Sequence, residues 1–166
     1  ATSSASGIQA LKGSAYIALS MLCSKLGIRI LPFLPKFAPA LLKELDQGLK
    51  RLEGLNEEMK LLEGEESGDA ITERQSQREE ILMLLQSLLS SLAAVVQNQS
   101  GLLSVYLHQM LVLLLSPTLL MIDKPVLKNS VQALYELISE QIETRLILPA
   151  VIDTYKSLPP HSPSSV

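Results

Sequence analysis

Six apolar stretches with helical periodicity run along this chain and fall into three pairs. The junction signature of the first pair, Arg29-Ile30-Leu31-Pro32, returns near the end as Arg145-Leu146-Ile147-Leu148-Pro149. A repeated helical hairpin is typical of solenoid proteins, in which each hairpin buries its apolar side against the next one. The sequence therefore predicts an all-α, HEAT/armadillo-like α-solenoid of three helix pairs, a class that binds partners more often than it catalyses reactions.

The first pair is bounded by turn and helix-start residues. Ser14 is a plausible N-cap, and Gly27 follows the last apolar turn, so the first helix is expected from about Ser14 to Lys25. The second helix is expected from about Pro32 and keeps apolar residues at helical spacing, namely Leu34, Phe37, Leu41, Leu42 and Leu45.

A charged insertion is predicted at about 48–75, between the first and second pairs. The acidic run Glu63-Gly64-Glu65-Glu66-Ser67-Gly68-Asp69 reads as a solvated loop, and some helical extension is expected before it. Thr72 and Gln75 match a capping box, which predicts that the third helix begins near Glu73. Removing this insertion leaves two periods of roughly 45 residues, the length of a HEAT-type helix pair.

The remaining helices follow from the same patterns. The third is expected to end near Val96 and the fourth to run from about Leu102 to Leu115. The fifth starts after Asp123-Lys124-Pro125 and has one solvated side, and the sixth runs from about Leu146 to Leu158. The predicted organisation is a flexible N-terminal segment over 1–13, a helical domain over 14–158 and a Pro/Ser-rich tail or linker over 159–166, which reads as a piece of something longer.

The composition argues against nucleic-acid binding through overall charge and against a membrane-spanning helix. The chain has 166 residues, 47% of them hydrophobic, and a net charge of −3, which gives no overall positive field for nucleic acid. Residues 81–122 carry no Asp, Glu, Lys or Arg, but Ser and Gln side chains and Pro117 break the run. We therefore expect a buried middle repeat, no membrane span and no signal peptide.

Residue types that carry catalysis or bind metal are sparse. Cys23 is the single cysteine, and His108 and His161 are the two histidines, one in an apolar helix and one in the tail. No nucleophile–base pair, metal-ligand spacing or glycine-rich phosphate loop is visible. The sequence predicts no enzyme activity, no cofactor, no metal and no small-molecule substrate, and a buried structural thiol at Cys23.

One basic feature remains. Lys36, Lys43 and Lys50 recur every seven residues and should share a face of the second helix, which in a HEAT solenoid lines the concave side. We interpret this lysine stripe as the candidate partner-binding face, although lysines at this spacing also serve solubility alone. Together with Arg29 and Arg51, the stripe leaves open an RNA-binding module as an alternative function.

A family resemblance rests on three runs. They are Tyr16-Ile17-Ala18-Leu19-Ser20-Met21-Leu22-Cys23-Ser24-Lys25-Leu26-Gly27-Ile28-Arg29-Ile30-Leu31-Pro32-Phe33-Leu34-Pro35-Lys36-Phe37, then Leu85-Gln86-Ser87-Leu88, and Arg145-Leu146-Ile147-Leu148-Pro149. Over roughly 14–158 the chain resembles the very large HEAT-repeat proteins of the small-subunit processome, which associate with the U-three small nucleolar RNA particle. The Leu-Gly-x-Arg-x-Leu-Pro core is the most specific part, and the acidic insertion after Asp46 has no match in the family pattern.

The resemblance implies a nucleolar scaffold without catalytic residues, acting in small-subunit pre-rRNA processing and linked to rRNA transcription. The implied partners are other small-subunit processome proteins, with indirect or weak RNA contact. A HEAT-type adaptor of another pathway, similar to the karyopherins, shares the fold and stays open as an alternative.

Overall fold

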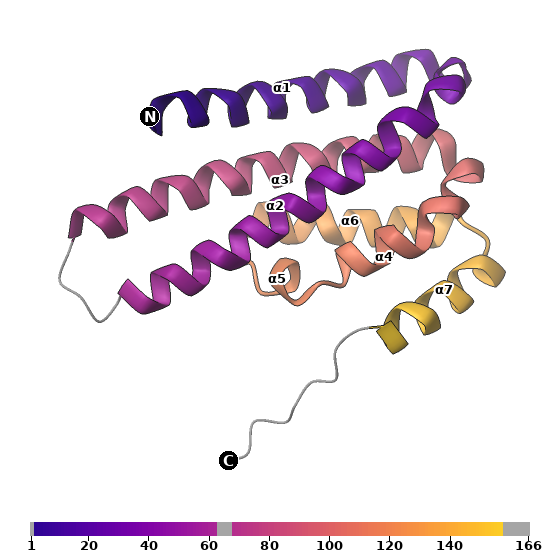
Figure 1. Cartoon of the computed structure of the whole chain (residues 1–166). Helices are drawn as coiled ribbons and strands as arrows, with labels where there is room; N and C mark the ends of the chain where they lie inside the picture. The colour runs from indigo at the N-terminus through magenta and orange to yellow at the C-terminus, as the bar shows by residue number, and fades with distance from the viewer. Residues whose placement is uncertain (1, 63–67, 158–166) are drawn as a thin grey trace.

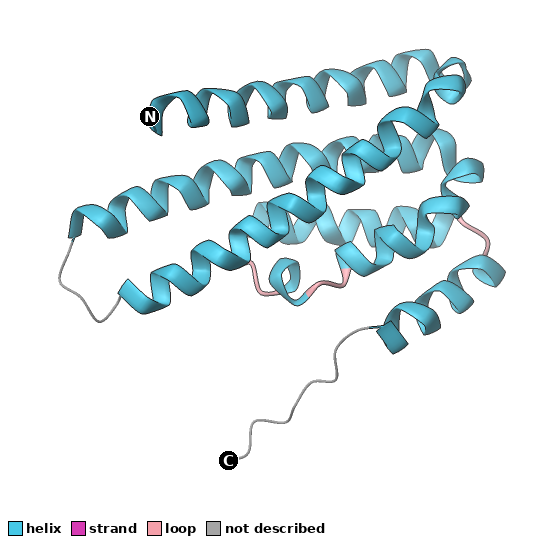
Figure 2. Cartoon of the chain, in the orientation of Figure 1, coloured by secondary structure: helices cyan, strands magenta, loops and turns pink. Residues whose placement is uncertain are grey.

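The computed structural model describes residues 2–62 and 68–157, and every regular element in these residues is helical (Figure 2). The elements are α1 (Thr2–Leu26), η1 (Gly27–Phe33), α2 (Leu34–Leu62), α3 (Gly68–Leu103), η2 (Ser104–Tyr106), α4 (Leu107–Leu114), α5 (Pro117–Leu120), α6 (Pro125–Gln141) and α7 (Thr144–Ser157). The predicted all-α, HEAT-like helical-repeat fold is confirmed.

The helices form two layers (Figure 1). In one layer, α3 lies between α1 and α6 and contacts both. In the other, α4 lies between α2 and α7, and α2 also packs on α3 across the layers. Each pair thus adds one helix to each layer, which is how a HEAT-like stack builds a continuous core from short hairpins.

The junction of the first pair explains its signature residues. α1 ends at Leu26, and Gly27 has φ +51°, a backbone conformation that glycine adopts at little cost. The 3₁₀ segment η1 then turns the chain, with Ile30 buried and Pro32 in its last turn. The predicted helix end at Gly27 is confirmed, whereas α2 begins at Leu34, two residues later than predicted.

Most of the buried core residues are leucines. Leu42 and Leu52 of α2, Leu85 and Leu88 of α3, and Leu134 of α6 are at most 1% exposed. Helix α3 supplies buried residues toward all three of its neighbours, so its long uncharged run is the centre of the stack. The expectation of a middle repeat that is covered by its neighbours is therefore confirmed for α3.

The prediction of a flexible segment over 1–13 is wrong for the residues that the structure describes. Helix α1 begins at Thr2, and its first half packs along α3. Lys12 forms an ion pair with Glu44 of α2, and Gly13 lies against Ser87 of α3. Ser14 is inside the helix and donates a hydrogen bond to the carbonyl oxygen of Ala10, so it is not an N-cap. Tertiary packing sustains a helix where the local sequence alone suggested none.

The predicted insertion over 48–75 is also corrected. Most of it continues the two flanking helices, because α2 extends to Leu62 and α3 already begins at Gly68. Residues 63–67 of the acidic run lie outside the described residues. Thr72 does not cap a helix near Glu73, since its hydroxyl donates to the carbonyl oxygen of Gly68 within α3. The result is a long helical hairpin that extends past α5 and α6 (Figure 1).

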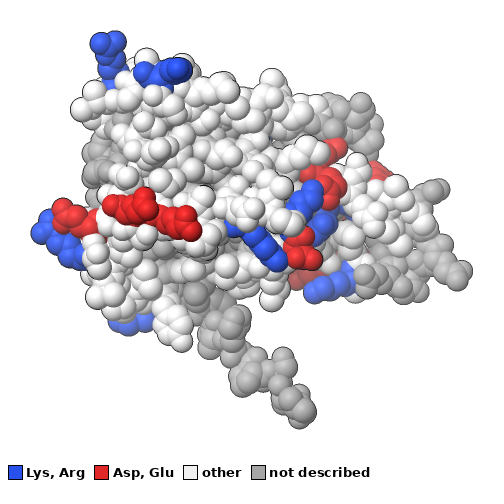
Figure 3. All heavy atoms as spheres, turned by 180° about the vertical axis from the view of Figure 1, so that it is seen from behind, with Lys and Arg blue, Asp and Glu red and all other residues white. Residues whose placement is uncertain are grey.

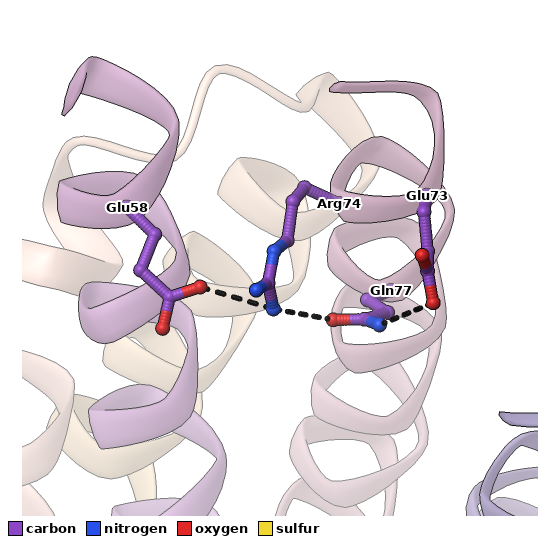
Figure 4. A network of polar contacts seen from close by, with 4 residues as sticks. All are labelled: Glu58, Glu73, Arg74 and Gln77. Carbon is purple, nitrogen blue, oxygen red and sulfur yellow. Dashed lines mark hydrogen bonds and ion pairs between the residues drawn. The ribbon is translucent and has the colours of Figure 1, made fainter. Parts of the chain in front are cut away.

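Polar contacts join the two arms of this hairpin (Figure 4). Arg74 of α3 pairs with Glu58 of α2 at 3.0 Å and donates to the side-chain oxygen of Gln77. Gln77 in turn donates to Glu73 within α3. Arg78, which the figure does not draw, donates to Asn56 of α2. The Arg74–Glu58 and Arg78–Asn56 contacts join α2 to α3 beyond Leu55, the last buried apolar residue of α2.

The middle pair departs from its predicted boundaries. Helix α3 continues to Leu103, past the turn expected after Val96, and the rest of the predicted fourth helix is divided into η2 and α4, with the short α5 following it. Ser116 caps α5 by accepting a hydrogen bond from the backbone amide of Leu119, and Pro117 occupies the first helical position, where its missing N–H is not needed. The predicted tail over 159–166 lies outside the described residues.

Candidate interaction surfaces

The lysine stripe lies on one exposed side of α2, as its spacing predicted. Lys36, Lys43 and Lys50 are all exposed. Lys50 is paired with Asp46 at 2.7 Å, and the next step of the stripe is the exposed Glu57. The positive charge is therefore concentrated in the first half of α2. Partner binding by this stripe stays a prediction.

The structure does not bring the other basic residues into one patch with the lysines. Arg29 is exposed on η1, before α2 begins, while Arg51 lines a hollow of about 400 Å³ between the three long helices together with Gln9, Glu58 and Glu80. Acidic side chains thus accompany Arg51. Such mixed charge weakens the electrostatic attraction that RNA backbone binding requires.

The candidate catalytic and metal-binding residues, Cys23 and His108, lie on different helices. Cys23 is fully buried in the first pair, and burial raises the pKa of its thiol, so the reactive thiolate is disfavoured. His108 is exposed on α4, and its Nδ1 lies 3.3 Å from the hydroxyl of Thr154 on α7. His161 lies outside the described residues. Within 2–62 and 68–157, no group of three His, Cys, Asp or Glu side chains could hold a metal ion.

Sequence reasoning missed an apolar surface on the outer side of α1. Ile8, Leu11 and Leu22 are 53%, 70% and 50% exposed, and Ala15 and Ala18 between them are exposed too. These five residues follow alternating three- and four-residue steps, the spacing with which one helix seats against another. We call them the α1 stripe. The opposite side of the same helix, with Gly13 and Cys23, is buried in the stack.

The two sides of the α1, α3 and α6 layer differ in polarity. On α6, Lys128, Gln132 and Glu136 are exposed, which confirms the predicted solvated side of this helix. Lys128 pairs with Asp123, and Gln132 donates a hydrogen bond to Glu136. The layer is therefore polar along α6 and apolar along α1. Seen from behind, the molecule has a few clusters of charge separated by broad uncharged areas (Figure 3).

Two helical stretches of the described chain are long and apolar enough to cross a membrane by length and composition, Gly7–Leu61 and Ala70–Asn98. The most apolar part of Ala70–Asn98 is 56% buried within the molecule, as in the core helix of a soluble protein, whereas that of Gly7–Leu61 is 17% buried. Length and composition alone are weak evidence for a membrane span. The low burial of the first stretch reflects the exposed outer side of α1.

No protein-family model matches this chain, and no solved structure is detectably similar to it. Among curated proteins, the chain is similar to the HEAT repeat-containing protein 1 homolog of Dictyostelium discoideum, with 29% identity over 147 residues. The match covers 86% of this chain but 6% of that relative, so the chain spans only a small part of the relative's length. The HEAT-like fold and this similarity indicate a protein-interaction scaffold.

Proposed function

We propose that this chain is a non-catalytic scaffold segment of a nucleolar ribosome-biogenesis factor that acts in small-subunit pre-rRNA processing and rRNA transcription. The support is the resemblance of the Leu26-Gly27-Ile28-Arg29-Ile30-Leu31-Pro32 run to large HEAT-repeat proteins of the small-subunit processome, together with the similarity to a much longer HEAT repeat-containing relative. Other processome proteins are the proposed partners, and the nucleolus is the proposed location.

The observation that carries the scaffold role is the α1 stripe on the open side of a HEAT-like stack. Helix α3 packs against α1 on one side and against α6 on the other. The α1 stripe is a further apolar surface in the same layer, on the side of α1 that faces away from α3. A further helical hairpin of similar composition would continue that interface. Apolar surface of this kind usually marks a protein contact.

Proximity labelling in cells with the parent protein tests the proposed pathway. We expect labelled proteins to be enriched in assembly factors of the small-subunit ribosomal precursor. Recovery of transport receptors or vesicle-coat proteins in their place would contradict the proposal and favour an adaptor of another pathway.

A second candidate function, direct RNA binding, is favoured by the exposure of Lys36 and Lys43 along one helix. RNA held by these lysines should dissociate steeply as salt rises, whereas a partner held by apolar contacts should be much less sensitive. Replacing Lys36, Lys43 and Lys50 by Glu should abolish binding through the stripe without changing the circular dichroism spectrum. Unchanged binding by that variant would exclude the stripe for RNA and protein alike.

A further inference from the structure

A groove of about 490 Å³ lies between α1 and α3, on a different flank of α1 from the α1 stripe. Ala10, Gly13 and Ser14 of α1 and Ser87 of α3 are among the residues that line it. A Cβ atom at Gly13 would lie 3.3 Å from the Ser87 Oγ, so small side chains are what brings the two helices together here. Both rims of the groove are helices.

The apolar rims of the groove face solvent. Ile17 on α1 is 42% exposed and Met83 on α3 is 64% exposed, and both line the groove. Exposed methionine adapts its shape to different partners, because its side chain is unbranched and polarizable. Ile17 and Met83 therefore give the groove an apolar lining that can adjust to the shape of a partner.

The groove also carries acidic side chains and one unpaired polar atom. Glu79 is paired with Lys124 of the loop before α6, whereas Glu80 makes no ion pair within the described residues. The side-chain oxygen of Gln9, which also lines the groove, is buried and accepts no hydrogen bond there. Because that oxygen is closed off from the surface, Glu80 is the group that a bound partner could reach here without breaking an ion pair.

We propose that this groove binds an amphipathic helix of a partner protein, with the apolar side of the helix on Ile17 and Met83 and a lysine or arginine near one end at Glu80. The inference rests on the proposed scaffold role and adds the chemistry of one partner segment. The negative charge of Glu80 favours a basic residue near one end of the partner helix. A groove between two helices is a site where a third helix can pack. The stretch from Gln9 to Ile17 rises about 12 Å, which suits a partner helix of two to three turns.

The test uses the whole 166-residue chain and two fluorescent synthetic helices. Both carry leucine at successive i, i+4, i+7 positions, and they differ in a single Lys or Glu near one end. Titration followed by fluorescence anisotropy should show about fivefold tighter binding of the Lys peptide, as expected for one partly exposed ion pair. Glu80→Gln should remove this preference, and Glu140→Gln on α6 should keep it.

A bulky substitution in the groove distinguishes binding in the groove from non-specific electrostatic binding of the peptides. Ala10 is exposed, so Ala10→Trp should leave the circular dichroism spectrum unchanged while weakening both peptides at least tenfold. Equal binding of the two peptides, no binding of either, or binding that survives Ala10→Trp would overturn the proposal. Self-association abolished by Ala10→Trp, or binding to phosphatidylcholine vesicles in place of peptides, would overturn it in favour of a second copy or a lipid surface. None of these outcomes changes the proximity-labelling result, which tests the proposed pathway separately.

Discussion

At the scale of single residues, the packing of α2 on α3 leaves no room for a side chain at Gly48 of α2. A Cβ atom there would lie 2.9 Å from Cδ2 of Leu85, and Leu85 is fully buried and has little room to move. Gly54, on the same helix, has open space around it. Both glycines cost the helix stability relative to alanine, but only Gly48 is required by packing.

Replacing each glycine by alanine should therefore have different effects. Gly54→Ala should raise the free energy of unfolding by about 0.5–1 kcal/mol through helix propensity. Gly48→Ala gains the same propensity but overpacks the core, so it should be less stable than Gly54→Ala by about 1–3 kcal/mol. Urea unfolding of the two variants measures this difference directly. Equal stabilities would show that Leu85 can move aside.

Tyr135 couples stability to high pH. Its hydroxyl donates a 2.8 Å hydrogen bond to the carbonyl oxygen of Leu114, at the end of α4, and burial raises its pKa above the usual 10.0. The unfolded chain then loses this proton at lower pH than the folded chain does. Stability from this group is fully present below pH 10 and is lost as the pH rises toward the raised folded pKa.

Tyr135→Phe should accordingly lower the free energy of unfolding by about 1 kcal/mol at neutral pH. The variant should also lose less stability than the unmodified chain as the pH rises above 10.0, the usual tyrosine pKa, toward the raised folded pKa of Tyr135. Tyr155→Phe is the matched control, because Tyr155 is 79% exposed and its loss should cost less than about 0.5 kcal/mol. Chemical unfolding across this pH range gives both quantities. Parallel pH profiles for the Tyr135→Phe variant and the unmodified chain would contradict the assignment.

At the scale of elements, the hydrophobic periodicity of the sequence predicted the three helix pairs, but neither the short α5 nor all of the helix ends. The amphipathic pattern of α6 and Gly27 at the end of α1 are local signals, and both were read correctly. The start of α1 depends on packing against α3, and the hairpin arms depend on pairs such as Arg74 with Glu58. Contacts between distant residues leave no local pattern, so these ends could not be predicted.

The candidate surfaces also differ in whether local sequence patterns could predict them. The lysine stripe follows from seven-residue spacing alone, and its exposure on α2 agrees with that spacing. The groove required the approach of Gly13 to Ser87, and the α1 stripe required knowing that residues 8–13 are helical. Since α1 is apolar on both sides, its sequence has no clear polar face to mark the outer one.

Hydrogen exchange tests the corrected start of α1. If residues 8–13 are helical and packed on α3, their amides should exchange far more slowly than those of an unstructured peptide. Exchange in residues 20–26 of the same helix, which flank the buried Cys23, provides the internal reference. Complete exchange of residues 8–13 within the first time point would restore the prediction of a flexible segment.

At the scale of the whole molecule, the first pair is held to the middle pair around Cys23. This thiol is fully buried, and Tyr16, Phe37 and Ser91 surround it from three helices. Ser91 is itself buried and donates a 2.6 Å hydrogen bond to the carbonyl oxygen of Tyr16. Opening this contact separates the first pair from the rest of the stack.

Cys23 should therefore report on that opening. In the folded chain it should react with a thiol reagent orders of magnitude more slowly than in urea, because burial excludes the reagent and raises its pKa. Ser91→Ala should cost about 1 kcal/mol and speed the reaction about fivefold. Ser139→Ala on α6 is a suitable control, since the Ser139 hydroxyl is exposed and bonds only within its own helix. Fast labelling of the folded chain would refute the buried position.

The contrast between α1 and α6 limits how copies of this molecule can polymerise. A filament built by simple translation along the layer would press Ile8 and Leu11 of one copy onto Lys128 and Glu136 of the next. That contact would strip water from charges without supplying partners for them, which is unfavourable. Although the α1 stripe is apolar, this mismatch disfavours open-ended assembly. A concentrated solution of the chain should therefore stay free of fibres.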